Sequence, residues 1–163
     1  MLKLTGMAEA LAERGYRTLS AVPYEGSFWN RRRIHPALGF TRNLFVEDFE
    51  AGENIGWGLS DRDFLRQAAR ELLAGEKPFA AYLLTLSLHH PFAGFPAQLK
   101  ELDVGTWSGT PFGNFLHTMH YFDASLAAFM RSPSEATSSS SGWISSPAAL
   151  ALPIDLDLVL RSF

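Results

Sequence analysis

The chain has 163 residues, of which 47% are hydrophobic and 13% aromatic, and it carries a net charge of −3 at pH 7. This length and composition allow one domain with a substantial core and exclude a generally disordered chain. The acidic balance gives no electrostatic basis for nucleic-acid binding. Without cysteine, disulfides and thiolate metal sites are excluded. We also expect neither a signal peptide nor a membrane span, because the first residues are polar and no apolar stretch is long enough.

The first third of the chain predicts one short helix and one strand. Residues 5–14 are amphipathic, with Thr5 as the expected N-cap and Gly15 just past the end. Residues 16–22 have the composition of a strand. We then expect a polar, aromatic loop and no further regular element until residue 60.

The middle of the chain predicts a helix followed by a strand. Ser60 is the expected N-cap of a helix that closes at Gly75. Apolar residues repeat along it at helical spacing: Phe64, Leu65, Ala68, Ala69, Leu72 and Leu73. The continuous apolar run at 78–87 is typical of a strand buried on both faces. A helix, a short loop and a buried strand favour α/β layers around a parallel sheet.

The last part of the chain changes character abruptly. Residues 112–131 predict a second long helix with a broad apolar stripe. Residues 132–163 begin with a serine-rich run of low complexity and show no consistent period.

The loop "GSFWNRRR" contains a first candidate site. Trp29 and Arg31, two residues apart beside a glycine, offer a stacking face and a guanidinium fork for a phosphate or sulfate. The alternative is a buried tryptophan next to a solvated basic cluster, and composition alone does not decide between them.

The stretch "LHHPF" contains a second candidate. His89 follows the predicted buried strand, where α/β sheets place their ligands, and a neutral imidazole can hydrogen-bond a phosphoryl oxygen or bind a metal. Adjacent residues of an extended chain point in opposite directions, so at most one of His89 and His90 is expected to face a given site. The alternative is a surface histidine in a proline turn.

Other polar residues suggest no reaction by themselves. His117, His120 and Asp123 lie at steps of three on the predicted last helix, and such residues drift round a helix by about 60° per step. We therefore interpret them as structural or surface residues. The chain has no paired carboxylates at a spacing that suggests acid/base work and no phosphate-cradling glycine loop.

Four stretches, in this order, resemble one family. They are "ERGYRT" with "GSFWNRR", "IGWGLSDRDFLRQA", "KPFAAYLLTLSLHHPF" and "FLHTMHYFDASLAAF". Together they are similar to the catalytic domain of lipoteichoic-acid-synthase-type phosphoglycerol transferases, in the sulfatase-like branch of the alkaline phosphatase superfamily. The resemblance covers residues 4–130.

This resemblance implies a fold, a reaction and a location. The expected fold is part of a three-layer α/β/α sandwich, incomplete at both ends. In the family a hydroxyl nucleophile attacks a phosphodiester of a lipid or glycan, and a manganese or magnesium ion polarises the phosphoryl group. The parent enzyme is expected to be membrane-anchored with its catalytic domain outside the cytoplasm.

Three site residues carry over from the family motifs. Trp29 and Arg31 match the "FWNR" loop that lines the pocket for the phosphoglycerol head group. His89 matches the histidine of the "TLSNHxPF" motif, near the phosphoryl group, and His90 is at its variable position. Leu88 stands where the motif has asparagine.

The resemblance also implies what this chain lacks. Residues 1–131 are expected to be a partial catalytic domain without the family's nucleophile and most of its metal ligands. We therefore expect no bound metal and no turnover by this chain alone. Residues 132–163 are expected to be a tail outside the family pattern, which we hypothesise to be read out of frame, because a hydrophobic strand read in another frame can give a serine run. Two alternatives stay open: a non-catalytic phosphoester-binding module, and a piece of a sulfatase or phosphatase.

Overall fold

The structure, a computed structural model, describes residues 5–76 and 78–136. The chain divides into two compact units, Met1–Ser132 and Pro133–Phe163. Helix α4 (Pro111–Ala136) is the last described element. The rest of the low-complexity tail predicted for residues 132–163 lies outside the described residues, so the frameshift hypothesis is untested.

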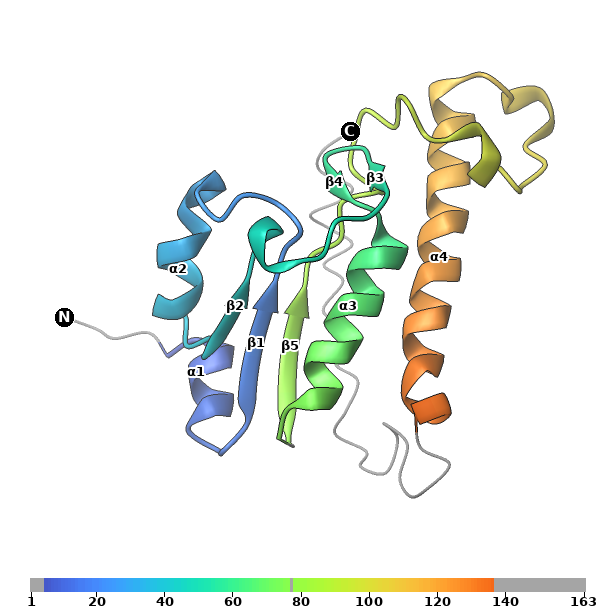
Figure 1. Cartoon of the computed structure of the whole chain (residues 1–163). Coiled ribbons are helices and arrows are strands. Elements are labelled where there is room, and N and C mark those ends of the chain that lie inside the picture. The colour runs from blue at the N-terminus through green and yellow to red at the C-terminus, as the bar shows by residue number, and fades with distance from the viewer. Residues whose placement is uncertain (1–4, 77, 137–163) are drawn as a thin grey trace. The chain divides into compact units, whose positions relative to one another are not determined.

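A parallel sheet lies at the centre of the first unit (Figure 1). Strand β1 (Arg17–Ala21) lies between β2 (Arg42–Leu44) and β5 (Phe79–Leu83), and both neighbours run parallel to it. Ala21 is in register with Leu44 on one side and Leu83 on the other, so the three strands end at the same edge. The loops that follow these strands therefore meet at this edge.

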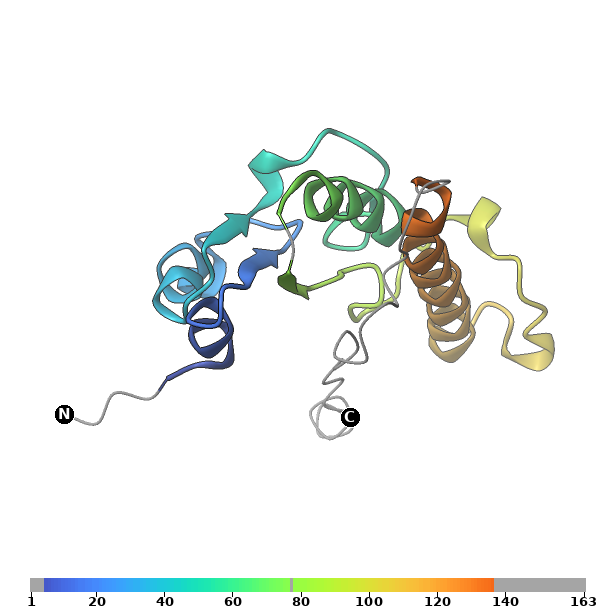
Figure 2. The ribbon, with the colours of Figure 1, turned by 90° about the horizontal axis from the view of Figure 1, so that it is seen from below.

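Helices cover both faces of the sheet. Figure 2 shows α1 (Met7–Ala12) and α2 (Arg31–Ala37) on one side and α3 (Asp61–Ala74) on the other. The predicted α/β class, with helices layered on a parallel sheet, is confirmed.

Helix α3 follows its predicted pattern closely. The Ser60 hydroxyl accepts a hydrogen bond from the Asp63 amide at 3.3 Å, which caps the first turn, and Gly75 follows the last residue. Five of the six predicted stripe residues are buried, with Phe64 fully inaccessible, whereas Leu73 is exposed. Burying a side chain of this size stabilises the fold by about 1.5–3 kcal/mol.

Several short elements were not predicted. Residues 31–37 form helix α2 with Pro36 inside it, and residues 42–44 form strand β2 within the segment expected to be a loop. Elements of seven and three residues have little intrinsic stability. They form because the sheet offers β1 as a partner for β2 and a face on which α2 packs.

The prediction that the apolar run at 78–87 is buried on both faces is wrong. Only residues 79–83 form a strand, and Tyr82 is 45% exposed. Among the described residues β5 is an edge strand that pairs only with β1, and β1 is the central strand. In β1 the last four residues are all buried.

The remaining elements are a hairpin, short 3-10 turns and helix α4. β3 (Asn54–Ile55) and β4 (Gly58–Leu59) form a hairpin. Ile55 packs in a small cluster with Phe95, in the loop after β5, and Tyr121 of α4. Short 3-10 turns span Phe28–Asn30, Val46–Asp48, Ala97–Leu99 and Gly105–Trp107. Helix α4 was predicted for residues 112–131 and is longer, whereas α1 is shorter than predicted and has Gly6 at its N-cap.

Candidate functional site

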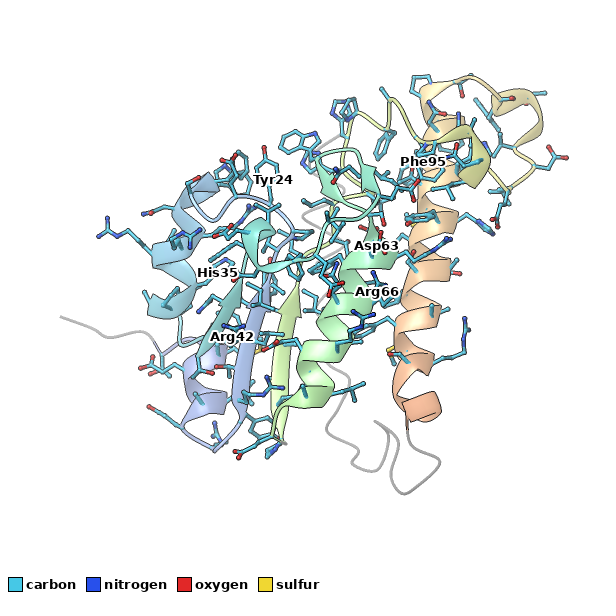
Figure 3. All side chains as sticks on the ribbon, viewed as in Figure 1. Tyr24, His35, Arg42, Asp63, Arg66 and Phe95 are labelled. Atoms are coloured by element: carbon cyan, nitrogen blue, oxygen red, sulfur yellow. The ribbon has the colours of Figure 1, made fainter. Side chains whose placement is uncertain are left out.

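All three predicted site residues lie beyond the carboxyl ends of the parallel strands. Trp29 and Arg31 follow β1, and His89 follows β5. Figure 3 shows Tyr24, from the same loop as Trp29, beyond the end of the strands. Ligands of open α/β sheets bind at this edge, because loops from neighbouring strands converge there.

The backbone turns sharply at Trp29 and Asn30. Their φ values are 52° and 56°, in the left-handed region that residues with a side chain rarely adopt. Trp29 is 76% exposed, whereas Arg31, at the start of α2, is only 8% exposed. Backbone strain of this kind costs about 1–3 kcal/mol per residue and is concentrated at functional sites.

Five rings form a continuous group, which we call the aromatic cluster: Tyr24, Phe28, Trp29, Trp57 and His89. Phe28 stacks on Trp29 with 5.3 Å between centroids and meets Trp57 edge-on at 6.2 Å. Tyr24 contacts both Phe28 and Trp57. The imidazole of His89 lies 4.1 Å from the Trp57 ring. The cluster thus links the loop after β1 to the loop after β5.

Arg31 packs against this cluster. Its guanidinium carbon lies 5.2 Å from the Phe28 centroid and 5.4 Å from the Trp29 centroid. Its Nη1 is buried and has no hydrogen-bond partner among the described residues. A buried charged donor without a partner is unfavourable, and a guanidinium fork matches the oxygens of a phosphate. Arg31 can therefore bind an anion at the aromatic cluster.

His89 and His90 have different surroundings. Nδ1 of His89 lies 2.6 Å from the carbonyl oxygen of His90, which can only accept, so this nitrogen carries the proton. Nε2 of the neutral ring is then the acceptor, and it becomes a donor when the ring is protonated. His90 instead contacts Phe92, outside the aromatic cluster.

A buried histidine lies one helical turn beyond Arg31. Nδ1 of His35 is 2.5 Å from the Ser20 hydroxyl of β1, and the ring is also close to Tyr82. Burial lowers the pKa of His35, and the positive charge of Arg31 lowers this pKa further. Arg31 therefore favours a neutral imidazole beneath the site (His35 is labelled in Figure 3).

Three residues near the site are buried or partly buried, and one of them, Leu88, stands where the family motif has asparagine. Val22 and Pro23, after β1, are buried against the core. Leu88 is partly buried just before His89.

Sequence reasoning missed three members of the aromatic cluster, Tyr24, Phe28 and Trp57. Phe28 precedes Trp29 in the same loop, and its sequence context alone does not mark it as a site residue. Trp57 lies between two glycines at the turn of the β3–β4 hairpin, an unusual place for a large ring. That glycine pair was the available signal.

The described residues do not form a metal centre. Within residues 5–76 and 78–136, no three histidine, aspartate or glutamate side chains gather closely enough to hold an ion. The manganese or magnesium ion expected for the parent enzyme therefore finds no donor set in this part of the chain.

Comparison with known proteins identifies a family. The family model described as "Sulfatase" matches residues 1–133. The lipoteichoic acid synthase-like protein YvgJ of Bacillus subtilis is 28% identical over 127 residues, covering 77% of this chain and 20% of YvgJ. A lipoteichoic acid synthase of Staphylococcus saprophyticus is 30% identical over 106 residues, covering 64% of this chain and 16% of that protein.

A solved structure has the same fold. The lipoteichoic acid synthase LtaP from Listeria monocytogenes superposes with a TM-score of 0.72 at 27% identity, covering 80% of this chain and 33% of LtaP. The chain thus spans about a sixth to a fifth of the length of these curated relatives and a third of the solved one.

Proposed function

Since this chain belongs to the sulfatase family and is similar to lipoteichoic acid synthases, we propose that it forms the head-group recognition part of a phosphoglycerol transferase domain. In this proposal the aromatic cluster and Arg31 bind the glycerophosphate portion of a phosphodiester. The lipid or glycan that bears this group is the expected partner.

The observation that carries the proposal is the environment of Arg31. Its guanidinium packs against the rings of Phe28 and Trp29, and its Nη1 lacks a partner among the described residues. A phosphoryl oxygen would supply that partner as a charge-assisted hydrogen bond, worth about 1.5–3 kcal/mol. Sequence resemblance and geometry therefore point to the same residue.

Trp29 and His89 have complementary roles in this proposal. The exposed indole of Trp29 offers a flat face against which the glycerol carbons can pack. Nδ1 of His89 donates to the His90 carbonyl, so Nε2 of the neutral ring can accept a hydrogen bond from a glycerol hydroxyl, and it donates to a phosphoryl oxygen only when the ring is protonated.

We propose that head-group binding needs no metal. Arg31, Trp29 and His89 are each able to contact the ligand directly, whereas the family's manganese or magnesium acts on the phosphoryl group during transfer. We predict that this chain alone does not catalyse transfer. Incubating it with a phosphoglycerol diester and measuring the alcohol released tests this prediction.

A binding module without catalysis is the second candidate. It is favoured by the lack of a three-donor group within residues 5–76 and 78–136. The two candidates share the Arg31 site and differ in turnover, so binding and product release, measured on the same preparation, distinguish them.

The domain boundary and the location are also proposals. We propose a partial sulfatase-like domain at residues 1–131 and a separate tail at 132–163, supported by the family match to residue 133 and by the compact unit that ends at Ser132. We propose that the domain works outside the cytoplasm as part of a membrane-anchored enzyme. Among the helices described here, none is long and apolar enough to cross a membrane.

Calorimetric titration of the full chain with sn-glycerol-1-phosphate in the presence of a chelator tests the proposal. We expect saturable binding by the wild type and a loss of affinity of about tenfold or more in Arg31→Ala, which corresponds to about 1.4 kcal/mol. Arg31→Lys keeps the charge but loses the guanidinium fork, so its affinity should lie between those of the wild type and Arg31→Ala. Arg33→Ala removes an exposed arginine two residues away and is the matched control.

Equal affinity in Arg31→Ala and Arg33→Ala would contradict the assignment of Arg31. Absence of saturable binding by the wild type would contradict the proposed function itself.

A further inference from the structure

The β3–β4 hairpin lies between the two loops that carry the candidate site. A Cβ added to Gly58 would be 2.5 Å from the Pro23 carbonyl oxygen, in the loop after β1, and 3.1 Å from the Leu86 side chain, in the loop after β5. Gly56 opens the hairpin turn with a φ of +67°, a position that hairpins reserve for glycine. Glycine at position 58 therefore lets the hairpin approach both loops closely, and glycine at position 56 lets the turn form.

Trp57, the second residue of that turn, contacts the imidazole of His89. The two rings are 4.1 Å apart and inclined by 33°. Trp57 also touches Tyr24 and Phe28, and it is 40% exposed. It therefore provides one wall for His89 and connects it to the rings that hold Arg31.

Asp61, four residues further on, holds the backbone that leads to His89. Its Oδ1 accepts hydrogen bonds from the amides of Leu86 at 3.1 Å and Ser87 at 2.9 Å. In return the Ser87 hydroxyl accepts from the Asp61 amide at 3.0 Å. These bonds fix the chain two and three residues before His89.

This arrangement is more than a helix cap. Ser60 already caps the first turn of α3, and the Asp61 carboxylate is fully buried with Oδ2 unpaired among the described residues. Burial raises the pKa of Asp61, although the hydrogen bonds from Ser87 and Leu86 oppose this. Burying a carboxylate is costly, so its two backbone bonds indicate a specific need to hold this loop.

We propose that Trp57 and Asp61 are positioning residues for His89: the hairpin segment that carries both fixes the His89 ring and its backbone relative to Arg31. This rests on the proposed function, in which His89 and Arg31 bind one phosphoester. Binding groups need to be held within about 0.5 Å of their productive geometry by the residues packed around them. A rigid hairpin shared by both loops limits displacement from that geometry.

Trp57 is tested first, because a partly exposed ring can be replaced without loss of the fold. The full chain, with isotope-labelled histidine, is compared by NMR as wild type, Trp57→Leu and Trp57→Tyr. Trp107→Leu is the control, since Trp107 is exposed to a similar degree (52%) and packs on Phe112, outside the aromatic cluster.

Without ligand, Trp57→Leu should shift the His89 ring resonances, because it removes an adjacent ring current. It should also weaken sn-glycerol-1-phosphate binding by about tenfold, or 1.4 kcal/mol. Trp57→Tyr should largely restore the affinity, and Trp107→Leu should change neither quantity. Unchanged affinity in Trp57→Leu would overturn the role of Trp57, even if the resonances move.

Asp61 is tested by two substitutions. Asp61→Asn retains an oxygen for the two amides, so the His89 resonances should keep their positions and most of the affinity should remain. In Asp61→Ala the resonances should shift and the affinity should fall. Asp123→Ala, at an exposed position of α4, is the control. Wild-type affinity in a folded Asp61→Ala variant would remove Asp61 from the proposal. If Asp61→Ala does not fold, Asp61→Asn decides. A folded Asp61→Asn variant with shifted His89 resonances and reduced affinity would also remove Asp61 from the proposal.

Failure of this inference differs from failure of the proposed function. If the wild type binds no glycerophosphate, the proposed function fails whatever the His89 resonances show. If the wild type binds and Arg31→Ala does not, but Trp57→Leu binds normally, only the positioning role fails.

Discussion

Two arginines near opposite ends of β1 show two uses of the same side chain. Nη2 of Arg17 donates to the carbonyl oxygens of Leu72 at 2.8 Å and Glu71 at 3.3 Å, at the end of α3. Arg31, beyond the carboxyl end, packs against the rings of Phe28 and Trp29. Each has one buried nitrogen without a partner among the described residues, Nε in Arg17 and Nη1 in Arg31.

The difference separates a structural cation from one available to a ligand. Arg17 satisfies the last carbonyls of a helix, where positive charge is favourable. Arg31 is held in place by rings that cannot satisfy its hydrogen-bonding capacity. Substitutions at the two ends of the sheet should therefore separate stability from binding.

The largest effect on stability is expected for Arg17→Ala. The loss of charged hydrogen bonds to the α3 carbonyls should lower the free energy of unfolding by about 1.5–3 kcal/mol in urea titrations. Affinity for sn-glycerol-1-phosphate should not change. Arg14→Ala, an exposed arginine three residues earlier, should change stability by less than about 0.5 kcal/mol. A loss of affinity in Arg17→Ala would contradict the distinction between the two ends.

Gly58→Ala disturbs only the carboxyl end. The added Cβ would collide with the Pro23 carbonyl, so the hairpin must shift, at a cost of about 1–3 kcal/mol in stability. Because the hairpin separates the loop of Arg31 from the loop of His89, glycerophosphate affinity should fall as well. Thermal unfolding and calorimetric titration measure both. Lower stability with unchanged affinity would mean that the hairpin does not set the site.

The pH dependence of stability should reveal the charge of Arg31. The pKa of His35 is lowered in the folded state, so below about pH 6.5 the unfolded chain binds more protons and stability falls as pH decreases. Urea titrations at pH 7 and about one unit below 6.5 should show this fall. His35→Gln should reduce it, and Arg31→Ala should reduce it in part. An identical pH dependence in wild type and His35→Gln would show that His35 makes no such contribution.

The smallest effect is expected for Glu71→Gln. The Glu71 carboxylate lies 3.9 Å from Arg17 and 3.2 Å from Arg42, and all three side chains are partly exposed. Exposed ion pairs contribute about 0.2–1 kcal/mol, and salt screens them. The loss of stability should thus disappear at high salt, whereas a salt-independent loss would point to a packing role for Glu71.

The long elements of the fold were predictable because their patterns are local. Ser60, the apolar stripe and Gly75 identify α3 without reference to the rest of the chain. Helix α2 and strand β2 were not predictable, because each is short and depends on a place at the sheet. The exposure of Tyr82 depends on strand order, which an apolar run does not encode.

The candidate site likewise contains residues that sequence motifs reveal and residues that only the fold reveals. Trp29, Arg31 and His89 were predicted because they lie in recognisable motifs, and their roles remain proposals. Trp57 and Asp61 were missed, since their significance comes from contacts with residues about 25 to 32 positions away. An aspartate after a capping serine is ordinary in sequence, and only the fold shows that its carboxylate is buried against two distant amides.

An NMR spectrum of the arginine Nε–H groups, recorded as sn-glycerol-1-phosphate is added to the full chain, tests the central claim most directly. Both arginines are observed in one sample, so stability and concentration are the same for each. The Arg31 signal should move and saturate, while the Arg17 signal should stay in place. A spectrum in which Arg31 is unmoved at saturation, or in which Arg17 moves instead, would contradict the assignment of the phosphoester site to the carboxyl end of the sheet.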